Sequence, residues 1–347
     1  MSNFDKNYIF KIAESRYQRI IMNFIKENWD SNHILGNQKN FFEYEHSLGD
    51  NLNFVIAINR STNQIEALQG FIPYTEKIKE GHVCGVMSCV SRESRMPLLG
   101  IETMKRMVSL TEPSSYCGIG TNPKTMLPLV KRVMKRHVGK MEHFYKINEY
   151  SLEFNIARIF TRITSRNKKL RCKNKRILFS EVHKYNAVEK SLDLSKTYKF
   201  RPFKDYWYIR KRYFDHPIYT YRFFLVRGEE SSSSSLLIGR NISLNGSKIL
   251  RFVDFIGDLA LLSSIGQNTD RLLHEEDLEY IDFLCAGVDR KILKNSGFIF
   301  KSDRDKNIIP NYFEPFVREN VDIFYETSFK NMILFKADAD QDRPSFF

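Results

Sequence analysis

The sequence predicts a mixed α/β (α+β) fold made of two similar halves, each a mixed twisted sheet flanked by helices. The chain has 347 residues, which is long for one hydrophobic core and sufficient for two domains. Segments of alternating and of helical periodicity follow one another in a mixed order. The same order of elements occurs twice, and this mixed order excludes a simple doubly wound sheet.

The first half begins with a helix and three strands that meander. Ile20, Ile21, Phe24 and Ile25 have helical spacing, and polar turn residues separate the apolar runs that follow. A strand, a loop and a helix then form a unit whose helix N-terminus can bind phosphate. The predicted elements are a helix at 15–28, strands at 54–58, 65–74 and 82–90, a loop at 91–100, a helix at 101–110, a strand at 116–120, a helix at 124–135 and a closing strand at 142–148.

The second half repeats this plan in element order, without sequence identity to the first. Its predicted elements are a helix at 205–214, strands at 219–227, 236–243 and 249–257, a helix at 259–273, a strand at 278–284, a helix at 288–294 and tail strands at 321–326 and 331–336. We therefore expect domains at 1–150 and 179–347, joined by a crossover at 151–178.

The crossover carries much of the net charge of +13. Nine Lys and Arg residues lie between Arg158 and Arg176, with no acidic residue among them. Such a run forms either a solvated face or a contact with a phosphate-rich partner. CoA, a nucleotide-linked substrate, a membrane surface and RNA all remain open as that partner.

The remaining composition predicts a cytoplasmic protein without a metal site. The five cysteines are scattered, and none stands in a CxxC pair or completes a zinc spacing with histidine. An odd number of scattered thiols indicates a reducing compartment. The N-terminus does not resemble a signal peptide, and no apolar run reaches the length of a membrane span.

Several segments resemble a known family. The loop and helix start Arg95–Ile101 occupy the place of the phosphate-binding loop of the GNAT acyltransferases, although Gly100 is the one glycine in it. The tail Asn331–Pro344 resembles the C-terminal signature of tandem-GNAT sugar N-acyltransferases of bacterial O-antigen and surface-polysaccharide pathways. Segments that also agree are 29–35, 70–73, 212–219, 251–257, 280–283 and 309–315.

The resemblance implies transfer of an acyl group from a CoA thioester to the amine of a nucleotide-linked aminodeoxy sugar. The donor would be acetyl-CoA or 3-hydroxybutanoyl-CoA, and the acceptor a dTDP-3-amino-3,6-dideoxyhexose. In that family the donor enters where two parallel strands separate, with its pyrophosphate on the amides before a helix. The first domain would therefore bind acyl-CoA, through Met96, Leu98, Leu99, Gly100 and Ile101, and the second the nucleotide sugar.

The acceptor chemistry needs a base, and two residues are candidates. Asp254 interrupts an apolar strand, and such a carboxylate needs a partner or a raised pKa. His216 precedes Pro217, which fixes an extended approach to the next strand. Both have a structural alternative, as an inward Asp bonded to a loop and as a turn histidine.

Six residues are candidates for holding the nucleotide sugar. Asn311 can pair with a pyrimidine edge, Tyr312 can stack on it, and Arg343 can hold a phosphate with two hydrogen bonds. Asp282 interrupts an apolar strand as Asp254 does. Arg251 and Tyr219 stand in segments that resemble the family. Each of these also has a structural alternative, such as a turn former, a packed ring or a salt bridge.

Two other functions remain open at this point. Aminoacyl transfer from charged tRNA, by enzymes that also use two GNAT-like halves, would account for the basic run and the glycine-poor loop. A non-catalytic binding module would account for that loop and for Val130, which stands near the position of a tyrosine acid in many GNAT enzymes. The acyl group, the sugar and a homodimer are likewise open.

Overall fold

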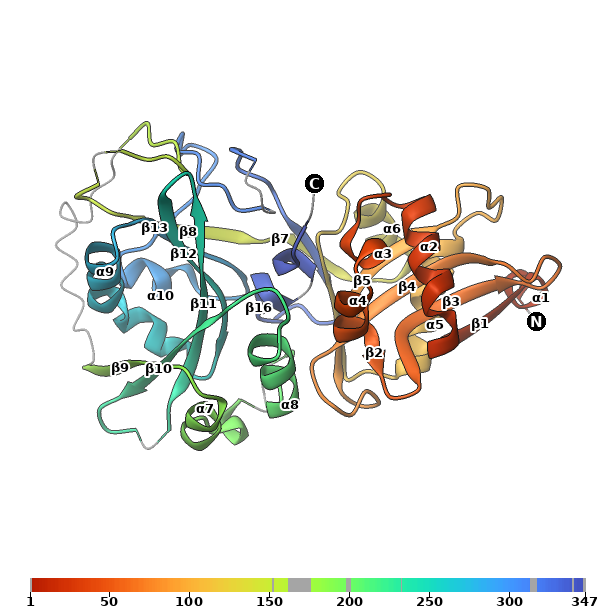
Figure 1. The fold of residues 1–347 in the computed structure, drawn as a ribbon, viewed down its shortest axis with the longest axis horizontal. Helices are drawn as coiled ribbons and strands as arrows, with labels where there is room; N and C mark the ends of the chain where they lie inside the picture. Colours follow the sequence, from red (N-terminus) through yellow and green to blue (C-terminus); the bar gives the residue numbers. More distant parts are fainter. Residues whose placement is uncertain are drawn as a thin grey trace.

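The computed structural model has two lobes, each built on a mixed sheet (Figure 1). It describes residues 2–151, 153–161, 176–197, 201–231, 233–312, 317–338 and 340–345. The predicted mixed α/β class with two separate sheets is confirmed. Of the basic run, only Arg158 and Arg176 belong to the described residues, and Cys172 lies outside them, as do residues 313–315 of one resembling segment.

The first sheet has the order β1-β3-β4-β5-β6-β15-β7, with β2 paired to β3. Its strands are β1 (Tyr8–Glu14), β2 (Ser47–Leu48), β3 (Asn51–Asn59), β4 (Ile65–Pro73), β5 (His82–Val90), β6 (Ser115–Ile119), β7 (His137–Lys140) and β15 (Phe324–Thr327). The helices of this lobe are α1 (Asn3–Asn7), α2 (Gln18–Asn28), α3 (Ile34–Asn37), α4 (Lys39–His46), α5 (Leu99–Thr111) and α6 (Met126–Val133). All neighbours in the sheet are antiparallel except β5 and β6.

The second sheet has the order β14-β8-β13-β12-β11-β10-β9, with β16 paired to β13. Its strands are β8 (Glu142–Ile147), β9 (Ile177–Val182), β10 (Arg222–Gly228), β11 (Ser235–Leu244), β12 (Ser247–Ile256), β13 (Leu278–Ala286), β14 (Ile299–Phe300) and β16 (Leu334–Phe335). Its helices are α7 (Tyr185–Ser191), α8 (Tyr206–Ile209), α9 (Gly266–Glu275) and α10 (Arg290–Asn295). Here β12 and β13 are the parallel neighbours.

The two lobes exchange strands, which corrects one expectation. The strand predicted to close the first half, β8, pairs with β13 and β14 of the second sheet. The first sheet is instead completed by β15, which comes from the C-terminal segment (the described residues after β14) and lies between β6 and β7. Local periodicity identifies a strand but carries no information about its partner, so this exchange could not be predicted from it.

Two predicted helices differ in kind from the observed segments. The 205–214 helix is the short α8 followed by a π-helical turn at Arg210–Phe214. The 259–273 helix is a 3₁₀ segment, Leu259–Ser264, followed by α9. Asp258 caps the start of the 3₁₀ segment, because its carboxylate accepts the amide hydrogen of Ala260 at 3.0 Å.

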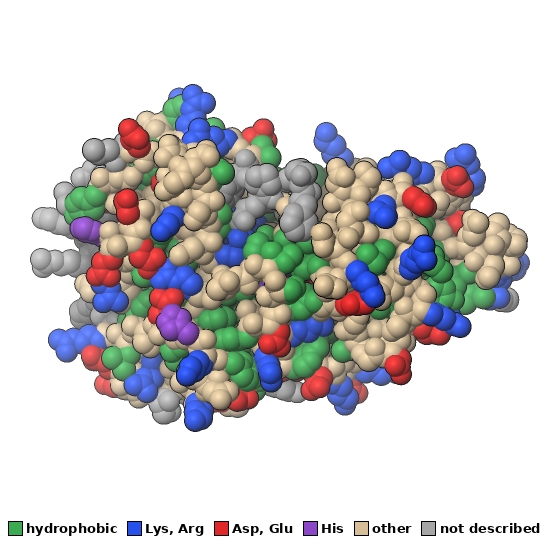
Figure 2. Space-filling model, viewed as in Figure 1, with side chains coloured by type: hydrophobic (Ala, Val, Ile, Leu, Met, Phe, Trp, Pro, Cys, Tyr) green, Lys and Arg blue, Asp and Glu red, His purple; other side chains and the backbone are tan. Residues whose placement is uncertain are grey.

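The core continues from one lobe to the other. One cluster of buried apolar residues joins Phe24 and Phe42 of the first lobe to Tyr213 and Phe223 of the second. Figure 2 shows hydrophobic side chains gathered where the lobes meet on this face. The Tyr44 hydroxyl of α4 donates to the Lys211 carbonyl at 2.9 Å across this contact. The lobes are therefore joined by packing as well as by the chain.

In the second sheet the C-terminal segment fills the space where the parallel strands stop pairing. The last pair between β12 and β13 is Phe252 with Phe283, and β13 then pairs with β16. The segment 334–338 contacts both strands there. Lys204 holds it in place through ion pairs to Asp254 at 2.6 Å and Asp338 at 2.5 Å. All three side chains are buried.

The buried ion pairs of Lys204 with Asp254 and Asp338 predict a loss of stability when the lysine is replaced. Lys204→Met leaves two buried carboxylates without their cation, so we expect the free energy of unfolding to fall by about 3–5 kcal/mol. Urea unfolding measures it. Lys140→Met is the matched control, because Lys140 pairs with Asp322 at the surface and its loss should cost no more than about 1 kcal/mol. Equal losses in the two variants would contradict the assignment.

Candidate active site

The first sheet opens where its two parallel strands separate. β5 and β6 pair from His82 with Ser115 to Gly85 with Gly118, and β5 then continues to Val90 paired with β4 only. Its register with β4 slips between Gln69 and Gly70, which leaves Met87 as an extra residue with φ of 46°. An extra residue in a bulge has no ladder partner. The separated part of β5 therefore presents main chain to the opening.

A cavity of about 610 Å³ lies at this separation. Its walls include the separated strands, the segment between α2 and α3, the start of α6 and the tail at 340–345. Trp29, His33, Met87, Tyr116, Glu326 and Gln341 are among its lining residues. The volume is in the range of small-molecule sites.

Two facing glycines make room for polar side chains on one face of the strands. A Cβ on Gly85 would lie 2.3 Å from the Tyr116 hydroxyl, and a Cβ on Gly118 would lie 3.2 Å from the nearer Glu326 carboxylate oxygen. The first contact is shorter than real Cβ contacts and the second is tighter than most of them, so the glycines leave room for the Tyr116 and Glu326 side chains on this face. The result is a hydroxyl and a carboxylate at the floor of the cavity.

Glu326 is a candidate that the sequence analysis missed. Its side chain is 2% exposed, and its carboxylate oxygen Oε1 accepts a hydrogen bond from the Tyr116 hydroxyl at 3.3 Å. Burial raises its pKa to about 7, against the opposing effect of Arg136. The signal was present in Phe324-Tyr-Glu-Thr327, where a carboxylate interrupts an otherwise apolar and β-branched strand.

The predicted donor residues lie beside this opening, at the start of α5. Leu98 has φ of 60° and precedes the helix, and no side chain caps the first turn, Leu99–Ile101. The first amides of a helix have no intrahelical acceptor. Ser94 anchors the preceding loop through its hydroxyl, which donates to Glu66 at 2.9 Å, and Met96 packs against Leu99 and its neighbours. Met104 of α5 reaches the cavity wall, whereas residues 96–101 do not line it.

The two predicted bases lie away from this cavity. Asp254 is fully buried, pairs with Lys204 and accepts the Tyr213 hydroxyl hydrogen bond at 2.5 Å. His216 accepts the amide hydrogens of Ile218 and Tyr219 at Nδ1, and burial followed by the charge of Arg212 lowers its pKa to about 3. Neither residue is among those that line the cavity. Their catalytic role stays a prediction.

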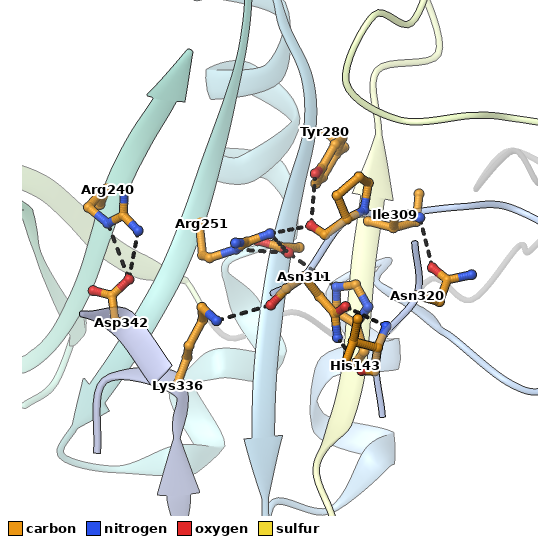
Figure 3. Close-up of polar contacts among 12 residues, drawn as sticks. His143, Arg240, Arg251, Tyr280, Ile309, Asn311, Asn320, Lys336 and Asp342 are labelled. Atoms are coloured by element: carbon orange, nitrogen blue, oxygen red, sulfur yellow. Dashed lines mark hydrogen bonds and ion pairs between the residues drawn. The ribbon is translucent and has the colours of Figure 1, made fainter. Parts of the chain in front are cut away.

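Three predicted substrate residues are buried in the second lobe, where other protein groups take up their hydrogen bonds (Figure 3). Arg251 donates to Asp282 at 2.8 Å and to the Pro310 carbonyl, and His143 bonds the same carboxylate at 3.1 Å. Despite burial, Arg251 and His143 hold the Asp282 pKa down at about 2. Asn311 exchanges both hydrogen bonds with the Val321 main chain. These contacts join β8, β12 and β13 to the C-terminal segment.

The other three predicted substrate residues divide between two places. Tyr312 and Arg343, which come from the C-terminal segment, line the cavity of about 610 Å³. Arg343 also pairs with Glu45 of α4 at 2.6 Å and with Asp340 at 3.2 Å. Tyr219 instead stacks on His216 and lies under the Arg240 guanidinium, away from the opening.

Within the described ranges, no group of three or more His, Cys, Asp or Glu side chains could hold a metal ion. The helices of the same ranges include none with the length and hydropathy needed to cross a bilayer. Cys84, Cys89, Cys117 and Cys285 are free and buried.

The raised pKa of Glu326 predicts a pH-dependent stability. A carboxyl whose pKa is about 7 when folded and 4.5 when unfolded costs stability as pH rises between those values. Glu326→Gln removes this cost. The free energy of unfolding of the variant minus that of the native chain should therefore increase by about 3 kcal/mol between pH 4.5 and pH 7. Urea unfolding across this range measures the difference.

Asp322→Asn is the control for this measurement. Asp322 lies in the same segment but is exposed and pairs with Lys140 at the surface, so its replacement should cost no more than about 1 kcal/mol. A flat difference for Glu326→Gln would contradict the raised pKa.

Comparison with solved structures shows the fold of the GCN5-related N-acetyltransferases. The structure of such an enzyme from Anabaena variabilis matches over 92% of this chain and 72% of its own, with 10% identity and a TM-score of 0.51. Saccharomyces cerevisiae N-myristoyltransferase with bound myristoyl-CoA is also similar, over 92% of this chain and 80% of its own, with 10% identity and a TM-score of 0.45. No protein-family model and no curated protein matches the sequence. At these identities the likeness is one of fold.

Proposed function

We propose that the protein is an acyl-CoA-dependent N-acyltransferase whose reaction takes place in the cavity between β5 and β6. The observation that carries this proposal is the separation of two paired parallel strands around a lined cavity, beside an uncapped helix start. An acyltransferase must hold a thioester in an extended channel and present its carbonyl to an amine. A gap between strands provides both the channel and main-chain groups along it.

The phosphate groups of the donor would lie at the first turn of α5. The amides of Leu99, Gly100 and Ile101 are unpaired within the helix and lie at its positive end. Anions bind helix starts for this reason. The pantetheine arm would then follow β5 toward Ser88 and Met87, which line the cavity. The acyl group, acetyl or 3-hydroxybutanoyl, would lie near Gly118.

The acceptor would be the amine of a nucleotide-linked aminodeoxy sugar, such as a dTDP-3-amino-3,6-dideoxyhexose for a surface polysaccharide. Support for it comes from the segments that resemble the sugar N-acyltransferases and from the position of Tyr312 and Arg343 on the cavity wall. A ring and a guanidinium can hold a base and a phosphate. We further propose a cytoplasmic location, where CoA thioesters and nucleotide sugars both occur.

The first test concerns the donor. Gly100→Pro removes one amide hydrogen from the first turn of α5, and loss of one hydrogen bond to a charged group should weaken CoA binding about tenfold or more. Gly100→Ala is the matched control, because it adds a Cβ, 3.0 Å from a Val90 methyl, and keeps the amide. Calorimetric titration with CoA measures both, after a melting curve has shown that each variant is folded. Equal affinities would reject the site.

The second test concerns the reaction. Thiol release from acetyl-CoA and 3-hydroxybutanoyl-CoA is followed with a panel of dTDP- and UDP-linked amino sugars and the corresponding free amino sugars. We expect release with at least one nucleotide-linked sugar and much slower release with its free counterpart, because the nucleotide contributes binding energy. Absence of release across the panel would overturn the proposed function.

A further inference from the structure

Glu326 reaches the proposed site from a distant part of the chain. β15 lies between β6 and β7, and Glu326 pairs in register with Gly118 on one side and Val138 on the other. Gly118 is the last β6 residue paired with β5 before the strands separate. The carboxylate therefore lies at the point where the donor and acceptor would meet.

One oxygen of this carboxylate has no hydrogen-bond partner among the described residues. Oε1 accepts from the Tyr116 hydroxyl, whereas the buried Oε2 has no hydrogen-bond partner among the described residues. Arg136, between α6 and β7, is the charged group that acts on it, with its guanidinium 4.5 Å from the Tyr116 ring centroid. A buried oxygen without a partner is costly unless it serves a ligand. Glu326 is also among the residues that line the cavity.

Other titratable groups on the cavity wall are less suited to accept a proton. Asp340 is paired with Arg343 at 3.2 Å, and Asp30 accepts the Asn32 amide hydrogen at 2.9 Å on an exposed turn. His33 uses Nδ1 to accept the Leu35 amide hydrogen, and burial lowers its pKa to about 4. A histidine with so low a pKa is a weak base at neutral pH.

We propose that Glu326 is the general base that takes a proton from the acceptor amine, directly or through one water molecule. This inference rests on the proposed function and deepens it. The active site of the first lobe is then incomplete without the C-terminal segment. A base works best when its pKa is near the working pH, and burial places Glu326 in that range.

The ammonium of the acceptor gives one proton to Glu326, and the neutral nitrogen attacks the thioester carbonyl carbon. A C–N bond forms, and the C–S bond breaks as the tetrahedral intermediate collapses. A second proton passes from that nitrogen to the departing sulfur, so CoA leaves as the thiol. Glu326 then releases its proton to solvent.

Carboxyl titration tests the inference without turnover. The Glu326 signal in a protein labelled with ¹³C at glutamate is assigned by its loss in Glu326→Gln, then titrated from pH 4 to 9 with and without acetyl-CoA. We expect a midpoint near 7 that shifts when acetyl-CoA is bound, because the donor excludes water from the carboxylate. A midpoint below 5, or one indifferent to saturating acetyl-CoA, would overturn the inference.

Kinetics test it with the acceptor that the sugar panel identifies. Glu326→Gln should lower kcat about 100-fold or more, keep the KM for acetyl-CoA within about threefold and remove the acidic limb of the pH profile near pH 7. Glu326→Asp should keep that limb and part of the rate. Asp322→Asn, an exposed change in the same segment, should match the native enzyme.

The two proposals fail in different ways. A native enzyme that releases no thiol with any acceptor overturns the proposed function. A native enzyme that turns over, with a Glu326→Gln variant within threefold of its kcat or with the same acidic limb, overturns the role of Glu326 alone.

Discussion

Neighbouring parallel strands that separate leave main-chain hydrogen-bonding groups and inward side chains uncovered, so other protein atoms, water or a ligand must meet these groups. This constraint acts twice in the molecule, once in each sheet. In the second sheet, residues 334–338 occupy the space between β12 and β13, and Lys204 ties them to Asp254. In the first sheet the space between β5 and β6 remains as a cavity of about 610 Å³. The same sheet geometry therefore yields a filled site in one lobe and an open one in the other.

The C-terminal segment produces this difference and connects its two sides. It supplies β15 to the first sheet and β16 to the second, and its end at 340–345 forms a wall of the cavity. Arg343 joins that wall to α4 through Glu45, while Asp342 joins it to β11 through Arg240 at 2.7 Å. A carboxylate from residue 326 can consequently act on a site built mainly from residues 29–126. Buried charges that pair across elements fix such a segment in one position.

The sequence predicts the local elements well and their partners poorly. The strand at 82–90 is observed with the predicted bounds, and the helix after it begins two residues early, at Leu99, because alternation and helical spacing are local properties. Strand exchange depends on pairing between residues 118 and 326, which no window can contain. Asp254 and Glu326 show the same limit for sites. Both interrupt apolar strands, and only the fold reveals that Lys204 neutralises the first while the second faces a cavity.

Hydrogen exchange of the native chain with and without CoA tests most directly which of the two separations holds the donor. Amides protected by a bound ligand exchange more slowly in proportion to its occupancy. CoA bound between β5 and β6 slows exchange at residues 86–88 and 99–101 and leaves residues 253–257 and 334–338 unchanged. Protection at residues 253–257 and 334–338, with none at residues 86–88 and 99–101, would contradict the account.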